Sequence, residues 1–279
     1  MSGRLFVVAT PIGCLEDITL RALRVLREVD LILAEDTRHT RTLCTKHGIS
    51  TPLRSFHAHS NEDKVLQIVD ELTNGAQYAL VSDAGTPLVS DPGVYLVSLA
   101  AEAGIPVEPI PGPSAVLAAL CVGGLPVRRF VFEGFLPRGG GDRSRALERV
   151  AQSEVTVVLF ESPHRIHATL EDLERVLGSD RSIALCRELT KMHEQTIRGT
   201  VREVRGKLSS PARGEITVVI EGKAADAAIE DIDLDALLLE WKREGLSTKE
   251  MTHRLQQDLG WKRNRAYRAV LDASKQDQT

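Results

Sequence analysis

Short apolar runs recur along the first part of the chain, and each is followed by a turn-forming loop and a helical pattern. The runs Leu5–Ala9 and Leu31–Ala34 are almost continuously hydrophobic, as in strands that are buried on both faces. Residues 20–28 follow the first run, and residues 94–101 follow a third run at 78–82; both segments have helical spacing. This alternation predicts an α/β domain with a parallel sheet.

Loops rich in proline and glycine follow several of these strands. They occupy residues 10–13, 85–93 and 111–115. Gly85 permits a positive φ or a close approach to a ligand, while the prolines fix φ and remove hydrogen-bond donors. Ligands in open α/β sheets bind at the carboxyl ends of strands. We therefore expect the three loops to wall a single cleft, the alternative being rigid connections that bind nothing.

The pattern changes at Gly123–Pro126, which we interpret as a domain boundary. Strand-like runs follow at residues 155–160, 182–186 and 214–222, and residues 196–204 have the pattern of a strand and a turn. This arrangement predicts a mixed sheet. Before residue 155, a flexible basic loop is expected that contains Arg138, Arg143 and Arg145. Its arginines suggest contacts with the phosphates of RNA, and a solvated loop is the alternative.

The C-terminal part has a different character. Residues 223–235 are acidic and rich in alanine, which is typical of a linker, and Ser247–Glu250 has the pattern of a helix capping box. A last helix is expected over residues 262–272, with basic residues Lys262, Arg263 and Arg265. Three short helices with a basic last member resemble a nucleic-acid-binding module, although a solvated basic face is the alternative. The expected domains are 1–123, 124–224 and 225–279, the last being linker and helical module.

Composition narrows the class of protein. The 279 residues carry a formal net charge of −4, which argues against non-specific coating of nucleic acid. No apolar run of membrane-spanning length occurs, and no signal peptide is evident. Four widely spaced cysteines form no Cys-x-x-Cys pair, so neither zinc nor disulfides are expected, and a reducing cytoplasm fits. His57 and His59 are interpreted as ordinary polar residues, because no third metal ligand is evident nearby.

Charged clusters stand where strands end. They are Glu35–Arg38, Glu161–Arg165 and Arg187–Lys191. Solvated turns with internal ion pairs are the simple interpretation. Together with the three loops, however, these clusters resemble one family, the tetrapyrrole methylase superfamily, and within it the cytidine 2′-O-methyltransferases of small-subunit ribosomal RNA. The motifs that carry the resemblance are, in order, Thr10–Gly13, Glu35–Arg38, Ser82–Pro87, Ser90–Gly93, Pro111–Ala115, Glu161–Arg165 and Arg187–Lys191. One departure is Cys14, where the family usually has asparagine.

The resemblance implies two α/β domains that hold S-adenosylmethionine in the cleft between them, and a homodimer that acts on the small ribosomal subunit and its 16S RNA. It also agrees with the absence of a Gly-x-Gly-x-x-Gly motif after the first strand. Backbone atoms grip the cofactor in this superfamily. The cofactor contacts implied are Pro11, Ile12, Gly85, Thr86, Val89, Ser114, Ala115, Phe160, Glu215 and Ile216.

Methyl transfer to a ribose hydroxyl needs alignment of the reactants and benefits from a base. Asp36 and Glu188 are the candidate bases, and Arg38 or Lys191 is expected to hold a phosphate or the developing negative charge. An ion-pair network that shapes the cleft is the alternative role for all four. Two other functions remain open at this point. One is methylation of a tetrapyrrole carbon or a protein side chain, and the other is RNA binding by a non-catalytic assembly factor.

Overall fold

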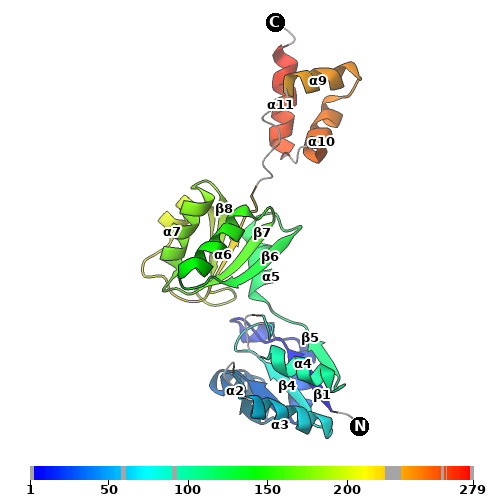
Figure 1. Cartoon of the computed structure of the whole chain (residues 1–279), viewed down its shortest axis with the longest axis vertical. Helices are drawn as coiled ribbons and strands as arrows, with labels where there is room; N and C mark the ends of the chain where they lie inside the picture. The colour runs from blue at the N-terminus through cyan, green and yellow to red at the C-terminus, as the bar shows by residue number, and fades with distance from the viewer. Residues whose placement is uncertain are drawn as a thin grey trace. The chain divides into compact units, whose positions relative to one another are not determined.

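The computed structural model describes residues 3–57, 61–89, 93–223, 234–258, 261 and 263–276. These residues belong to two compact units, one that ends at Gly222 and one that begins at Lys223. Figure 1 shows the elements of both units, and each unit is described here by itself. Several residues named in the sequence analysis lie outside the described residues, namely His59, Ser90, Asp91, Pro92, Lys262 and most of the expected linker.

The first lobe of the first unit is built on a parallel sheet of five strands in the order β3-β2-β4-β1-β5. Every pairing in this sheet is parallel, as the alternating pattern predicts. The strands are β1 (Arg4–Val8), β2 (Leu31–Ala34), β3 (Leu53–Ser55), β4 (Gln77–Val81) and β5 (Val107–Ile110). The helices between them are α1 (Leu20–Glu28), α2 (Thr37–Lys46), α3 (Glu62–Thr73) and α4 (Val94–Glu102), with a 3₁₀ turn, η1 (Leu15–Asp17), before α1.

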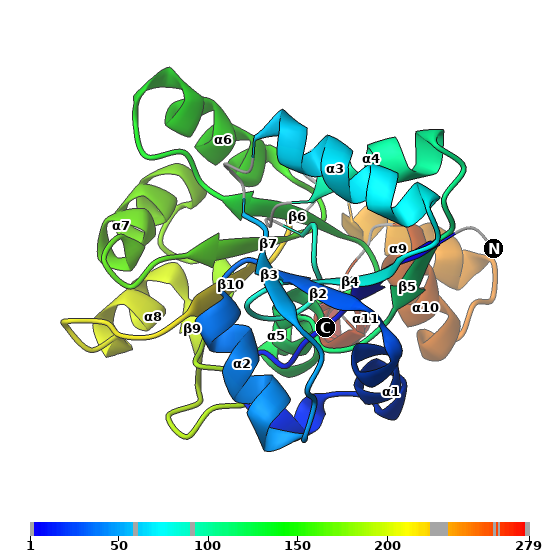
Figure 2. The same ribbon diagram turned by 90° about the horizontal axis from the view of Figure 1, so that it is seen from below.

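Helices cover both faces of this sheet. Successive side chains of a strand point to opposite faces, so Phe6 packs in the core with α1 and α2, whereas Leu5 packs in the core with α3 and α4. Figure 2 shows α3 and α4 on one side of the strands and α1 and α2 on the other. Burial on both faces explains why the strands are apolar without a polar alternation.

The second lobe contains a mixed sheet in the order β6-β7-β10-β8-β9. Only β6 and β7 pair in parallel, and the other pairings are antiparallel. The predicted mixed sheet is therefore confirmed. Its strands are β6 (Phe130–Phe135), β7 (Thr156–Glu161), β8 (Ser182–Arg187), β9 (Gln195–Thr200) and β10 (Ile216–Ile220). Its helices are α5 (Ala115–Gly123), α6 (Gly140–Gln152), α7 (Ile166–Leu177) and α8 (Val201–Lys207).

Helix α5 follows a strand of the first sheet in sequence but packs on the second. Its buried residues Val116, Ala119 and Leu120 share a core with Val158 and Val219 of the mixed sheet. The loop of residues 111–114 that precedes this helix therefore passes from one lobe to the other. Ser114 occupies the N-cap position, with extended backbone, but its side chain makes no capping hydrogen bond.

Two segments differ from the sequence-based expectation. The basic segment expected as a flexible loop is helical from Gly140 onward, because the Arg143 guanidinium is anchored inside the lobe and Asp142 favours the helix N-terminus. The turn expected near residue 201 is helix α8. Thr200 and Glu203 form a reciprocal capping box there, which satisfies backbone donors at its first turn.

The second unit is a helical module with its own core. It contains α9 (Leu234–Arg243), α10 (Thr248–Asp258) and α11 (Arg263–Gln276), and its core is formed by Leu238, Trp241, Met251, Leu255, Ala266 and Val270. The predicted capping box is present, since Ser247 and Glu250 exchange hydrogen bonds at the start of α10. Within the described part of the chain, no helix is both long enough and apolar enough to cross a membrane.

Candidate functional site

Three loops of the first unit are joined by short hydrogen bonds. Thr10 and Gly85 form an isolated antiparallel bridge, with N···O distances of 2.8 and 3.1 Å between their backbones. The hydroxyl of Thr86 donates to the carbonyl of Pro113 at 3.1 Å. Gly85 has a φ of +86°, which favours glycine at this junction. The loops after β1, β4 and β5 are therefore held as one assembly.

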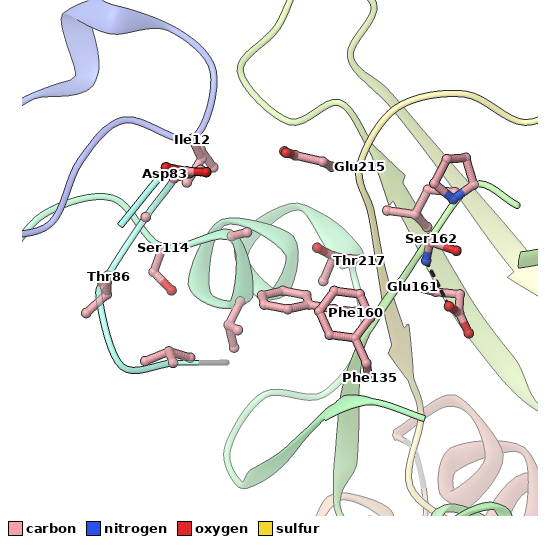
Figure 3. Close-up of a pocket in the computed structure, with 17 residues that line it drawn as sticks. Ile12, Asp83, Thr86, Ser114, Phe135, Phe160, Glu161, Ser162, Glu215 and Thr217 are labelled. Atoms are coloured by element: carbon pink, nitrogen blue, oxygen red, sulfur yellow. Dashed lines mark hydrogen bonds between the residues drawn. The ribbon is translucent and has the colours of Figure 1, made fainter. Parts of the chain in front are cut away.

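A cavity of about 360 Å³ opens against these loops. Its other wall comes from the carboxyl end of β7, the start of β10 and Phe135 of β6 (Figure 3). A volume in this range is typical of small-molecule sites. The lining residues are Ile12, Asp83, Ala84, Gly85, Thr86, Val89, Ser114, Ala115, Val116, Phe135, Phe160, Glu161, Ser162, Pro163, Glu215, Ile216 and Thr217.

Nine of the ten residues expected to bind a cofactor line this cavity. The exception is Pro11, which lines a neighbouring recess of about 80 Å³. The recess is also bordered by Thr10, His39, Thr40 and Asp83, together with Leu15, Thr42, Leu43 and Ser82. The expectation that the three loops wall one cleft therefore agrees with the geometry.

The lining of the cavity combines aromatic and acidic groups. Phe160 makes edge-to-face contacts with Phe135 and with Phe132, with ring centroids 5.7 and 4.8 Å apart. Asp83 and Glu215 bring carboxylates to the wall, from the first and second lobe respectively. Apolar surface with a few placed polar groups is typical of sites that bind small organic molecules.

Glu161 is a third acidic residue of the wall, but it is only 2% exposed and has a structural environment. It accepts hydrogen bonds from Thr169 Oγ1 at 2.6 Å and from Ser162 N at 2.8 Å, and Arg165 Nε lies 3.4 Å away. The Arg165 guanidinium also donates to the carbonyl of Leu136. The charged motif of residues 161–165 thus fixes the ends of β6 and β7 at the cavity.

The candidate base Asp36 forms a close ion pair with Arg38. Its carboxylate caps α2, accepting from Arg38 N at 2.8 Å, and receives the Arg38 guanidinium at 2.6 Å. These hydrogen bonds hold the pKa of Asp36 well below its usual range. Asp36 also donates its backbone N–H to Asp83 Oδ1 at 2.9 Å, which links this cluster to the cavity wall.

The candidate base Glu188 is also paired. Its Oε1 accepts from Lys191 Nζ at 2.9 Å and from Glu215 N at 3.0 Å, and Lys191 reaches the carboxylate of Glu215 at 3.0 Å. The hydrogen bond from Lys191 lowers the pKa of Glu188. Glu188 and Thr190 have left-handed backbones, with φ of +52° and +63°. Strained backbone of this kind is often found at functional sites.

The loop that contains Glu188 also contacts the first lobe. Cys14 donates its backbone N–H to Thr190 Oγ1 at 3.0 Å, so the contact at this position uses no side chain of Cys14. A Cβ on Gly13 would lie 2.5 Å from Lys191 Cγ and 2.9 Å from the carbonyl oxygen of Leu189. The loop of residues 10–13 can approach the second lobe this closely only because residue 13 has no side chain.

The residues expected to contact RNA lie in different environments. Arg138 is exposed, and Arg145 is an exposed partner of Asp142. Arg143 has only 12% of its side chain exposed and bonds Asp172, Thr169 and the carbonyl of Pro137. Arg263 and Arg265 belong to α11, but nothing is described of their side chains.

Some residues of the site were not anticipated from the sequence. Phe135, Glu161 and Asp83 line the cavity, and Glu35, near Asp83, has its pKa raised by burial and then by the charge of Asp83. Asp83 belongs to the motif Ser82–Pro87, which begins at the residue after β4. Its position at the end of a strand could have identified it as a residue of the site. Among the described residues, no group of three histidines, cysteines or carboxylates could hold a metal ion.

Comparison with known proteins adds to this geometry. Residues 4–205 match the model of the family described as Tetrapyrrole (Corrin/Porphyrin) Methylases. The chain belongs to the tetrapyrrole methylase family. This membership confirms both the resemblance seen in the motifs and the predicted fold class.

This tetrapyrrole methylase is similar in sequence to named relatives and similar in fold to a solved structure. Ribosomal RNA small subunit methyltransferase I of Haemophilus influenzae is 43% identical over 275 residues, 97% of each chain. The protein of the same name from Thermotoga maritima is 47% identical over 222 residues, 79% of this chain and 99% of its own. The structure of uroporphyrin-III C-methyl transferase from Thermus thermophilus, complexed with S-adenyl homocysteine, is 22% identical. It has a TM-score of 0.55 and covers 78% of this chain and 97% of its own, a likeness that concerns the fold alone.

Proposed function

We propose that the chain transfers a methyl group from S-adenosylmethionine to the 2′-hydroxyl of a cytidine in small-subunit ribosomal RNA. The observation that carries this proposal is the similarity, along nearly the whole chain, to proteins named ribosomal RNA small subunit methyltransferase I. The choice of cytidine rests on the motif resemblance. The cavity between loops of both lobes supplies the site that such a reaction requires.

The residues of the cavity fit S-adenosylmethionine. The apolar and aromatic residues, Phe160 among them, would hold the adenosine portion. Backbone groups of the loops at Gly85 and Ser114–Ala115 would bond its polar atoms, and the carboxylate of Glu215 suits its positive charges. When bound, this cofactor supplies a methyl group on a positively charged sulfur.

The protein's own contribution is mainly positioning. The linked loops and the bonded network at Glu161 fix the cavity before any ligand enters it. Holding two reactants in a productive geometry can contribute about 7–11 kcal/mol to lowering a barrier. Loops held by several short hydrogen bonds have the rigidity that this effect requires.

Asp36 and Glu188 could act as catalytic bases or as members of ion pairs that shape the cleft, and we infer the second role for both. Each carboxylate is bonded to a cation and has a lowered pKa. A base works best when its pKa lies near the operating pH. Asp36 with Arg38 and Glu188 with Lys191 would then frame the cleft, and the two cations would face the phosphates of the target strand.

The remaining partners follow from this substrate. The proposed contacts to the RNA backbone are exposed Arg138 and Arg145, together with Lys262 and the α11 residues Arg263 and Arg265. A homodimer and a cytoplasmic location, where ribosomes are assembled, complete the proposal. The proposed organisation is two α/β domains, predicted as 1–123 and 124–224, followed by linker and module at 225–279. Because α5 packs on the second sheet, we place the boundary between the first two domains at residues 111–114.

The test is methyl transfer from labelled S-adenosylmethionine to three acceptors: unmodified small subunits, their naked RNA and tetrapyrrole precursors. Label at a cytidine ribose of the RNA, whether naked or assembled, is the expected result. Label on a tetrapyrrole carbon alone would move the chain to another activity of the same family. Cofactor binding without transfer to any ribosomal acceptor would contradict the proposed substrate and favour an assembly factor.

A further inference from the structure

The small recess beside the main cavity contains an unsatisfied hydroxyl. Thr40, in α2, is 3% exposed, and its Oγ1 has no hydrogen-bond partner in the described structure. Buried polar groups are normally paired, so such an atom calls for a partner. The recess that Thr40 lines, with Thr10 and His39, has a volume of about 80 Å³ and can therefore admit a small polar group.

Asp83 lines both the recess and the main cavity. It follows β4 directly, at the sheet edge where ligands of such folds bind. A group in the recess would therefore meet a molecule in the main cavity at this residue. Figure 3 shows Asp83 beside Ile12 on the first-lobe side of the cavity.

Asp83 is also the carboxylate of the cavity wall that forms no ion pair within the described part of the chain, whereas Glu161 and Glu215 each form one. Its Oδ1 accepts from Asp36 N at 2.9 Å. In the described part of the chain, Asp83 forms no other hydrogen bond and no ion pair with a cation. The other acidic residues of the wall differ, because Glu161 is bonded at both oxygens and Glu215 is paired with Lys191. One oxygen of Asp83 is thus available to a ligand.

A second carboxylate, that of Glu35, lies near Asp83. Glu35 directly follows the neighbouring strand β2, which pairs with β4 up to Ala34 and Val81. Burial raises the pKa of Glu35, the charge of Asp83 raises it further, and His57 acts in the opposite direction.

We propose that the recess receives the hydroxyl-bearing edge of the target ribose, and that Asp83 is the catalytic base that takes the proton of its 2′-hydroxyl. This inference rests on the proposed function. As the proton passes to Asp83, an electron pair of the hydroxyl oxygen forms the bond to the methyl carbon. The electrons of the breaking carbon–sulfur bond remain on sulfur, which loses its positive charge. Thr40 bonds a ribose hydroxyl in the recess.

The experiment compares Asp83→Asn with the full-length wild type on unmodified small subunits. Asparagine retains an oxygen that can accept from Asp36 N, so the fold should persist, and its thermal midpoint is measured to verify this. We expect the single-turnover rate to fall by about 10²–10⁴-fold. Affinity for S-adenosylmethionine, measured by calorimetry, and affinity for the subunit should change by less than about threefold.

Asp36→Asn is the matched comparison, because asparagine is as good a helix N-cap as aspartate. We expect its single-turnover rate to fall by less than about tenfold, and the same for Glu188→Gln. Thr40→Val, which is nearly isosteric, should weaken subunit binding several-fold without weakening cofactor binding. An Asp83→Asn rate equal to the wild-type rate would overturn the assignment of the base.

The failure of this inference is distinct from the failure of the proposed function. If wild-type enzyme labels the subunit and Asp83→Asn labels it equally fast, only the inference fails. If wild-type enzyme labels no ribosomal acceptor, the proposed function itself fails. Loss of cofactor affinity in Asp83→Asn would also contradict the inference, because Asp83 would then belong to the cofactor site.

Discussion

Gly13 lies at a contact between the two lobes that leaves no room for a side chain. An alanine Cβ there would lie 2.5 Å from Lys191 Cγ and 2.9 Å from the backbone oxygen of Leu189. Backbone atoms cannot move aside as the end of a flexible side chain can. We therefore expect Gly13→Ala to cost about 1–3 kcal/mol in free energy of unfolding and to weaken cofactor binding, because Ile12 of the cavity is displaced.

Denaturant unfolding and calorimetric titration with S-adenosylmethionine measure the two effects. Gly206→Ala is the control, because a Cβ added to this residue of helix α8 would have nothing within 4 Å beyond its own helix backbone and chain neighbours. That variant should gain up to about 1 kcal/mol, since alanine favours helix. Equal stability and affinity in Gly13→Ala and wild type would show that the loop can retreat from the second lobe without consequence.

The sequence predicted the loops that line the cavity, whereas it could not predict how the charged residues pair. Proline and glycine between a strand and a helix specify a loop by local stereochemistry, and such loops contain seven of the ten residues expected to contact a cofactor. Which carboxylate keeps an unbonded oxygen depends on pairings between distant segments. Glu188 meets Glu215 N, and Asp83 meets Asp36 N, across separations that no local pattern encodes.

At the scale of elements, the basic segment that begins α6 combines two kinds of arginine. Arg143 is buried against Asp172 at 2.8 Å and also bonds Thr169, whereas Arg138 is exposed. Removing one partner of a largely buried pair leaves an uncompensated charge. We expect Arg143→Ala to lower the free energy of unfolding by roughly 2–4 kcal/mol, as measured by denaturant unfolding.

Arg138→Ala is the matched variant for the RNA proposal. Its stability should stay within about 0.5 kcal/mol of wild type, while its affinity for small subunits falls and depends less steeply on salt, as expected on losing one phosphate contact. Titrations at several salt concentrations test this. An unchanged salt dependence in Arg138→Ala would remove Arg138 from the RNA surface.

Helix starts were predicted well where a capping residue marks them, and less well where the start depends on packing against a distant segment. Thr19 caps α1 with a side-chain hydrogen bond, and this helix covers the expected residues 20–28. The early start of α6 depends instead on Arg143 reaching Asp172, 29 residues away, a contact that local spacing does not reveal. For the same reason the packing of α5 on the second sheet could not be read from its position after β5.

At the scale of the molecule, the proposed chemistry belongs to one compact unit. The cavity and the recess are lined by residues that precede Gly222, whereas the helical module has a separate core around Trp241 and Leu255. The relative from Thermotoga maritima is aligned over 99% of its own length with only 222 residues of this chain. Almost no residues of that relative remain outside the alignment, so it has little room for an equivalent of this helical module.

We therefore expect truncation after Gly222 to preserve S-adenosylmethionine affinity and the thermal unfolding of the remaining unit, while weakening binding to small subunits. The physical reason is the loss of positive charge in α11, which would contact RNA phosphates. A full-length variant with Lys262, Arg263 and Arg265 changed to glutamine separates charge from bulk. If charge is responsible, both proteins lose affinity and their binding depends less steeply on salt. If neither protein loses affinity, the module has no part in recognising the substrate.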